Sequence, residues 1–108
     1  MTNEQKRKAE ILEQYGIICK YISVLQKTID KYSGLKCVDL LIAELKAMQE
    51  KRTNVYNAVN AVTDEELRTI LTYRYIDGIT REQTAEALYM HDRTIARKTL
   101  KALEAVEI

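Results

Sequence analysis

The feature of this chain that most restricts its fold is a row of apolar residues spaced alternately by four and three positions. The row comprises Ile11, Tyr15, Ile18, Ile22, Leu25, Ile29 and Tyr32. Because this spacing returns each apolar side chain to the same side of an α-helix, it predicts one long helix with a single apolar seam. Gly16 lies inside the row and costs about 1 kcal/mol relative to alanine, which a seam of this length can absorb.

A second apolar pattern supplies a partner for the seam. The Ser33-Gly34 pair predicts a turn after the first helix, and the new pattern starts directly behind it. So short a link makes the two helices antiparallel neighbours, and residues 1–62 are predicted to form a long helical hairpin. Either the helices pack only on each other, or their seam also recruits a second chain. The second pattern consists of Leu35, Val38, Leu41, Ile42, Leu45, Val55, Val59 and Val62.

Two polar features interrupt the second pattern. Gln49 and Arg52 stand within the apolar stripe, and Thr53-Asn54 follows them. Threonine and asparagine favour helix caps over helix interiors. Whether the second helix is continuous or breaks near Thr53-Asn54 is therefore left open by the sequence.

Residues 63–108 hold the start and stop signals of three shorter helices. The capping box Thr63-Asp64-Glu65-Glu66 predicts the start of the first, with the threonine hydroxyl accepting from the backbone at Glu66. Asp77-Gly78 predicts its end, because glycine adopts the left-handed conformation of a C-cap without steric cost. Its predicted buried face is Leu67, Ile70, Leu71 and Tyr75.

The last two predicted helices have the order of a helix-turn-helix. A second capping box, Thr80-Arg81-Glu82-Gln83, opens a helix to about Leu88, and turn residues follow at Tyr89-Met90. A longer helix is predicted from position 91 or 92 to about Val106. In a helix-turn-helix the second helix enters the major groove of DNA. Ala85 permits the close helix crossing that this unit requires, and the apolar anchors are Leu88, Met90 and Ile95.

The composition agrees with an all-α fold, since the chain has no proline and three glycines. No apolar stretch reaches the length of about 20 residues that crosses a bilayer, and the N-terminus lacks a signal-peptide core, so a soluble, cytoplasmic protein is expected. Two cysteines and one histidine predict neither a metal nor another cofactor. The lack of a Gly-rich phosphate loop or a nucleophile–base pair argues against an enzyme.

The last helix is predicted to be apolar on one side and cationic on the other. Arg93, Arg97 and Lys101 fall within about 80° of one another on a helical wheel, opposite Ile95, Thr99, Ala102 and Val106. Most charge stripes are simply solvated surface, but the position of this one in a helix-turn-helix favours contact with a DNA groove. Overall charge gives no support, because residues 63–108 hold seven Lys or Arg against nine Asp or Glu.

Candidate DNA contacts follow from this placement. Phosphate contacts are expected from Arg74, Thr80, Arg81 and Lys101, and base contacts from Arg93, Ala96 and Arg97. Thr94 either packs at the helix start or donates its hydroxyl to a phosphate, and His91 is expected to cap the helix or contact a phosphate. Asp92 is expected to cap free N–H groups at the helix start.

The stretch from Asp64 to Glu104, somewhat over a third of the chain, resembles the sigma-70 region 4-like helix-turn-helix of small phage-encoded transcriptional regulators, including late-gene activators. The resemblance rests on Leu71, the run Arg74-Tyr75-Ile76-Asp77-Gly78, Thr80, Ala85-Glu86, Arg93-Thr94-Ile95 and Ala102-Leu103. It implies DNA binding at a promoter or operator, with RNA polymerase as a further candidate partner.

Four residues depart from the family pattern. Arg81 replaces a common aromatic residue, Thr84 replaces a usual isoleucine, and Lys98 falls near a normally apolar position. Tyr89 occupies a turn position often filled by glycine or asparagine, where a left-handed conformation costs roughly 1 kcal/mol or more. These departures bear on stability and target sequence more than on the fold.

Three functional hypotheses remain open. The first is a double-stranded-DNA-binding transcriptional regulator; because one head buries little surface, it is expected to be a homodimer through the N-terminal helices. The second is a DNA-packaging subunit similar to a small terminase, which would form a ring. The third is a helical module that binds RNA polymerase or another protein instead of DNA.

Overall fold

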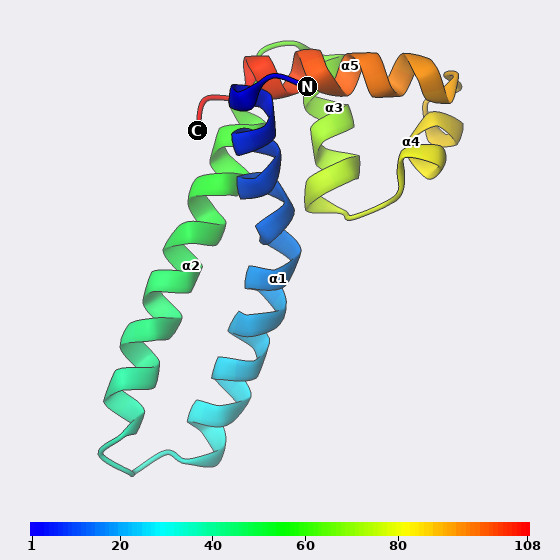
Figure 1. Ribbon diagram of the computed structural model, residues 1–108. Helices are drawn as coiled ribbons and strands as arrows, with labels where there is room; N and C mark the ends of the chain where they lie inside the picture. The colour runs from blue at the N-terminus through cyan, green and yellow to red at the C-terminus, as the bar shows by residue number, and fades with distance from the viewer.

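The protein folds as an antiparallel hairpin of two long helices with three shorter helices packed at its open end (Figure 1). A computed structural model describes all 108 residues. The long dimension of 53 Å, against 25 and 22 Å for the others, belongs to the hairpin. The predicted all-α fold, with a hairpin followed by a three-helix head, is confirmed. The α-helices are α1 (Asn3–Lys31), α2 (Val38–Asn60), α3 (Glu65–Leu71), α4 (Arg81–Ala87) and α5 (Asp92–Ala105).

Helix α1 starts eight residues before the apolar seam that predicts it. A capping box makes this start: the Gln5 backbone N–H donates to the Thr2 hydroxyl at 3.1 Å, and the Thr2 N–H donates to Gln5 Oε1 at 2.7 Å. Of the seam residues, Ile18, Ile22 and Leu25 are buried. The seam therefore faces α2, as the antiparallel hairpin requires. No helix of the protein has both the length and the apolarity to cross a membrane.

The connection between α1 and α2 is longer than the predicted two-residue turn. Residues 32–37 make it, Leu35 is 55% exposed within it, and α2 starts only at Val38. Leu35, the first residue of the second apolar pattern, therefore lies in the connection and not in α2. Packed helices lie about 8–10 Å apart, and two successive turns, closed by N–H to C=O bonds at Leu35 and Val38, cover that distance. Gly34 takes the positive φ of 95° that this path needs.

Helix α2 passes through Thr53-Asn54 without a break. Both side chains are exposed, so their polar groups are solvated and do not compete with the helical backbone. Val55 and Val59, directly after them, are buried. Their packing holds this part of the chain helical despite the low helix propensity of its neighbours.

Helix α3 starts one residue later than the predicted capping box. Asp64, not Thr63, is the N-cap, and its Oδ1 accepts from the Leu67 N–H at 3.0 Å. The prediction for Thr63 is therefore wrong by one residue, and the helix that starts at Glu65 buries Ile70 and Leu71. The Asp64 carboxylate also complements the positive end of the helix dipole.

A single π-helical turn, Thr72–Ile76, extends α3. Its wider winding was not predicted, and it places Tyr75 in the core. The turn ends where the sequence predicts, with the Asp77 N–H donating to the Thr72 carbonyl at 2.8 Å. Gly78 then adopts the predicted left-handed conformation, with a φ of 71°.

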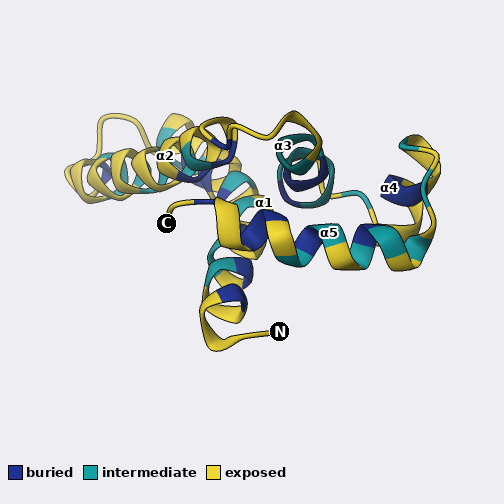
Figure 2. Cartoon of the chain, turned by 90° about the horizontal axis from the view of Figure 1, so that it is seen from above, coloured by how far each residue is buried: buried dark blue, intermediate teal, exposed yellow.

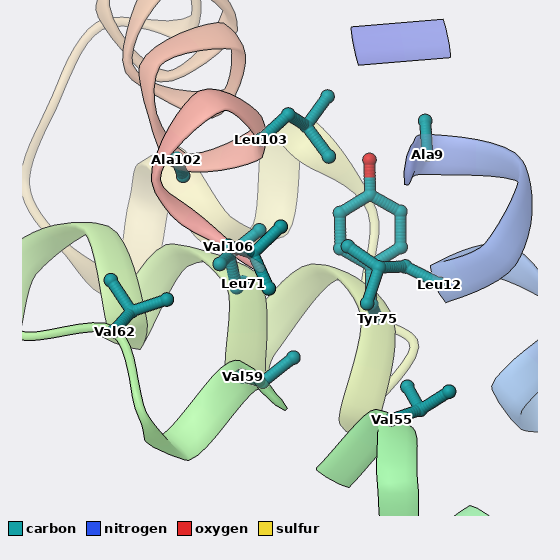
Figure 3. Close-up of a cluster of buried hydrophobic side chains, with 10 residues drawn as sticks. All are labelled: Ala9, Leu12, Val55, Val59, Val62, Leu71, Tyr75, Ala102, Leu103 and Val106. Atoms are coloured by element: carbon teal, nitrogen blue, oxygen red, sulfur yellow. The ribbon is translucent and has the colours of Figure 1, made fainter. Parts of the chain in front are cut away.

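The main hydrophobic core joins the hairpin to the head. It spans the predicted boundary between residues 62 and 63, and its side chains converge from four helices and the π-helical turn (Figure 3). The head therefore shares the larger of its two hydrophobic clusters with the end of the hairpin. The members are Ala9, Leu12, Val55, Val59, Val62, Leu71, Tyr75, Ala102, Leu103 and Val106.

Polar side chains from the start of α1 hold the other end of the chain against this core. Lys8 Nζ donates to the Val106 carbonyl at 2.7 Å, and an Arg7 terminal nitrogen donates to the Ile108 carbonyl at the same distance. Gln5 Nε2 donates to the Leu100 carbonyl at 3.2 Å. One of these carbonyl groups lies within α5 and two lie beyond its end, so the bonds tie α5 and the residues after it to the start of α1.

Candidate nucleic-acid interface

Helices α4 and α5 are joined by a short turn, in the order that the sequence predicts. Both bonds of the predicted capping box at Thr80 are present, between Thr80 and Gln83. A second hydrophobic cluster, made by Ile70, Ala85 and Ile95, holds the two helices together. Leu88 and Met90 pack against this cluster as predicted. Ala85 has the small side chain that lets α4 lie close to α5.

Thr84 fills a fully buried position in α4. Its hydroxyl donates to the Thr80 carbonyl at 2.8 Å. A buried hydroxyl that lacks a partner is costly, and this bond removes that cost. The replacement of the usual isoleucine by threonine is therefore compatible with the fold.

Helix α5 separates apolar from cationic residues as predicted. Ile95, Thr99, Ala102 and Leu103 are buried, and in Figure 2 buried and exposed residues alternate along the helix. Arg93, Arg97 and Lys101 are exposed. None of these three cations takes part in the intramolecular ion pairs of the chain. They form the outer face of α5, which keeps its positive charge available to a partner.

One acid interrupts the outer face of α5. Glu104 lies three turns after Arg93 on the same side of the helix, a position that the wheel analysis overlooked. Its carboxylate accepts from Gln5 Nε2 at 2.8 Å and so is held by α1. The cationic part of the outer face is thereby confined to positions 93–101.

The start of α5 differs from its prediction. His91 is the N-cap residue, but its imidazole makes no capping bond. Asp92 does not cap the helix either; its Oδ1 accepts from Arg81 Nε at 2.8 Å. The expected side-chain cap from Asp92 is wrong, because Asp92 is already the first residue of α5 and its carboxylate bonds to Arg81. For His91, the imidazole does not act as a cap, and the alternative of a phosphate contact stays a prediction. The first N–H groups of α5 are left without a side-chain partner.

Arg81 bonds to Asp92 but remains partly exposed to solvent. Its side chain is 45% exposed, and it uses only Nε for Asp92. Its two terminal nitrogens remain free of intramolecular acceptors. The guanidinium can therefore be oriented by Asp92 while it donates to another group.

A groove runs between the start of α1 and the middle of α5. Arg74, Arg81 and Ala96 line it on the head side, and Met1 and Glu13 line it on the α1 side. Arg74 also lies over the Tyr75 ring, 5.8 Å from the ring centroid. Three predicted contact residues are thus brought together. The approach of α1 was not predicted, since no local pattern signals a contact between residues that are about a hundred positions apart.

The remaining candidates surround the start of α5. Thr94 is half-buried and makes no side-chain hydrogen bond, and it lines two open hollows together with Arg93. Thr80 is exposed, with its hydroxyl accepting the Gln83 N–H. Lys98 pairs with Glu66 of α3 and so belongs to the packing of the head. It is not part of the outer face.

Burial affects one ionisable group near this surface. Desolvation in the core raises the pKa of the Tyr75 phenol, while the neighbouring Arg74 opposes that rise. The phenol is consequently neutral under ordinary conditions. The charge on this side of the head comes from Arg74 and Arg81.

Comparison of the chain with known protein families, curated proteins and solved structures finds no match. What the protein does has therefore to be inferred from the chemistry and geometry of its own residues.

Proposed function

We propose that this protein is a sequence-selective regulator of transcription that binds double-stranded DNA and inserts α5 into the major groove. The observation that carries the proposal is the outer face of α5, where Arg93, Arg97 and Lys101 are exposed and unpaired. The opposite face of the same helix is packed in a helix-turn-helix. A helix held in this way presents a rigid cationic face to a partner. The major groove of DNA is wide enough to admit one α-helix.

The position of each residue along α5 suggests its role. Arg93 and Arg97 are in the first half of the helix, which contacts base edges in such complexes, and arginine donates to both acceptors of guanine. Ala96 has a small side chain that permits close approach or contact with a thymine methyl group. Lys101, further along, is suited to a phosphate as a flexible point charge.

Phosphates of the flanking strand would be held by residues around the helix start. Arg81 has free terminal nitrogens and is oriented by Asp92, and Arg74 lines the same groove. Thr80, His91 and Thr94 can each supply a single hydrogen bond to a phosphate oxygen. These contacts would position the head without reading sequence.

The hairpin supports assembly into a homodimer. Ile17 and Val24 of α1 are 68% and 58% exposed, and with the partly exposed Tyr21 they form a row with the four-then-three spacing of one helix face. Leu40 of α2 is also exposed. One head buries too little surface for tight DNA binding, so a second copy is the occupant that the proposed function requires. Two heads would then read half-sites about 34 Å apart or a multiple of it.

The resemblance to sigma-70 region 4-like regulators supports a promoter or operator as the setting. Contact with RNA polymerase belongs to the same proposal. One observation favours a protein partner in place of DNA: acidic residues outnumber basic ones in residues 63–108, nine to seven. Recovery of RNA polymerase from lysate after nuclease treatment, with no binding to purified DNA, would favour that second candidate.

The decisive experiment is selection of binding sites from a random duplex library at moderate salt, followed by titration of the enriched sequence. Arg97→Ala is expected to weaken binding by about 1–3 kcal/mol, roughly 5- to 150-fold, and to relax preference at one base pair. Lys101→Ala should weaken all sequences alike and reduce the salt slope by about one. Lys46→Ala, at an exposed lysine of the hairpin, is the matched control. No enrichment, or equal binding by the Arg97 and Lys46 variants, would refute the proposal.

Assembly is tested separately by sedimentation. Val24→Glu places a charge in the exposed apolar row and is expected to convert a dimer to a monomer, because an unpaired charge is costly to bury. Ser23→Glu, at an exposed position elsewhere around α1, should leave the dimer intact. A monomeric wild-type protein would remove the dimer from the proposal, and a ring would favour the DNA-packaging alternative.

A further inference from the structure

Tyr89, in the turn between α4 and α5, combines backbone strain with complete exposure. Its φ is 54°, and it is the only residue other than glycine with a positive φ. Its side chain lies outside every cluster of the protein, since the residue is 97% exposed. The left-handed conformation is unfavourable for a residue with a β-carbon. No packing within the chain compensates for that cost.

The backbone of the turn explains the conformation but not the tyrosine. The Met90 N–H donates to the Ala85 carbonyl at 2.9 Å, and the Tyr89 N–H donates to the Glu86 carbonyl at 3.3 Å. This pattern closes α4 through a left-handed residue, a position that glycine or asparagine fills with less strain. The fold therefore needs the left-handed backbone at position 89 and makes no use of the aromatic ring.

The surroundings of Tyr89 are polar, with Arg93 as the nearest unpaired cation of the adjoining helix start. The turn lies at the end of α5 that points away from the hairpin (Figure 1). The hollow at the adjoining helix start is lined by His91, Asp92, Arg93 and Thr94, with no apolar residue among them. An aromatic residue that anchors a protein partner usually lies among other well-packed contacts, and none is present here. A phosphate-bearing partner fits these surroundings better.

We propose that Tyr89 is a further DNA contact, whose phenolic hydroxyl donates to a phosphate oxygen of the strand beside the groove entered by α5. The inference rests on the proposed function and adds a residue to it. Residues at the start of a recognition helix meet base edges, so the turn just before them lies where the sugar–phosphate strand passes. Tyrosine hydroxyls are among the side-chain donors that position proteins on DNA backbones.

Two substitutions separate the hydroxyl from the ring. Tyr89→Phe removes only the donor and is expected to weaken DNA binding about fivefold to tenfold, the loss of one solvent-exposed hydrogen bond. The loss should be equal for the selected site and for random DNA, and the salt slope should not change, since a neutral donor releases no counterion. Tyr89→Gly should weaken binding at least as much, while its denaturation midpoint does not fall because the strain is relieved. Tyr56→Phe, an exposed tyrosine of the hairpin, is the control.

The outcomes distinguish this inference from the proposed function. If the wild-type protein binds no duplex DNA, the proposed function fails and the role of Tyr89 fails with it. If the wild-type protein binds DNA and Tyr89→Phe binds equally well, the function stands and the phosphate contact is overturned. Loss of RNA polymerase binding by Tyr89→Phe, without any loss on naked DNA, would also overturn it and would assign Tyr89 to a protein interface.

Discussion

The two ends of the helical hairpin belong to the same two helices but are packed differently. At the head end, Ala9, Leu12, Val55 and Val59 join a core to which the head contributes the other half. At the far end α1 and α2 have only each other, and α2 holds no buried residue between Val38 and Val55. A helix that packs against one neighbour can cover only one side. The same pair of helices therefore joins a core shared with the head at one end, and forms a two-helix seam with exposed outer sides at the other.

This difference suggests a division of labour. The head end fixes the direction of α5, through the shared core and through bonds such as Lys8 to the Val106 carbonyl. The far end exposes apolar side chains, with Leu40 as much as 77% exposed. Rigid support suits the residues proposed to read DNA, whereas an uncovered apolar surface suits assembly.

The largest expected effect is a test of the shared core. Leu103→Ala is expected to lower the free energy of unfolding by about 3–5 kcal/mol, because Leu103 is fully buried and leaves a cavity. Leu41→Ala, at a half-buried position of the far end, should cost about 1–2 kcal/mol because less surface is lost from contact. Urea denaturation of both variants measures the difference. Equal losses would contradict the comparison between the two ends.

The next effect concerns the start of the head. Asp64→Ala is expected to lower the free energy of unfolding by about 1 kcal/mol, since it removes the N-cap of α3. Thr63→Ala should have almost no effect, because Thr63 is exposed and makes no capping bond. Thermal or urea denaturation of the pair checks this. If Thr63→Ala lowers the free energy of unfolding more than Asp64→Ala does, Thr63 is the N-cap after all, as the sequence pattern predicts.

A smaller effect is expected from the ion pair within the head. Lys98→Gln breaks the ion pair with Glu66. The side chain of Lys98 is 25% exposed and that of Glu66 is 45% exposed. Surface pairs contribute about 0.2–1 kcal/mol, and the contribution falls as salt rises. Lys101→Gln, at a lysine without an acidic partner, is the matched control. If both variants are equally stable at low salt, the pair does not help to join α3 to α5.

The smallest effect is a pH dependence that separates the core from the hairpin surface. Burial raises the pKa of Tyr75 above its ordinary value of 10.0, so above pH 10 the unfolded chain releases this proton before the folded protein does. The stabilisation is present in full below pH 10 and is lost as pH rises toward the folded-state pKa. Tyr75→Phe should therefore lose less stability than the wild-type protein between pH 8 and 10.5. Urea denaturation at the two pH values measures the loss. If the free energy of unfolding falls equally for the Tyr75→Phe variant and the wild-type protein, the prediction is wrong.

Local patterns predicted the features that depend on neighbouring residues. The four-and-three spacing predicted the seam of α1, and the box at Thr80 predicted the start of α4. Gly78 was expected in a left-handed conformation and has it. Such features are recognisable in a sequence because the atoms involved are a few positions apart, so short-range geometry determines them.

The misplaced or unforeseen features depend on distant contacts. The N-cap of α3 is Asp64 and not Thr63, although both side chains can cap a helix. Asp92 left its expected capping role for Arg81, eleven positions earlier. Gln5 binds Glu104, 99 positions away. A local pattern carries no information on which of several nearby donors a carboxylate will meet.

The sequence by itself determined the all-α fold, the long hairpin followed by three shorter helices, and the separation of cations from apolar residues along α5. It left open whether α2 is continuous, which the structure decided. Periodicity and capping chemistry act over one or two turns, so they can be read without a fold. Only the tertiary structure decided that the hairpin and the head share one core, and that α1 holds the end of α5. Those outcomes depend on which apolar surfaces meet. The hydrophobic effect stabilises a contact in proportion to the apolar area removed from water, however far apart the residues are along the chain.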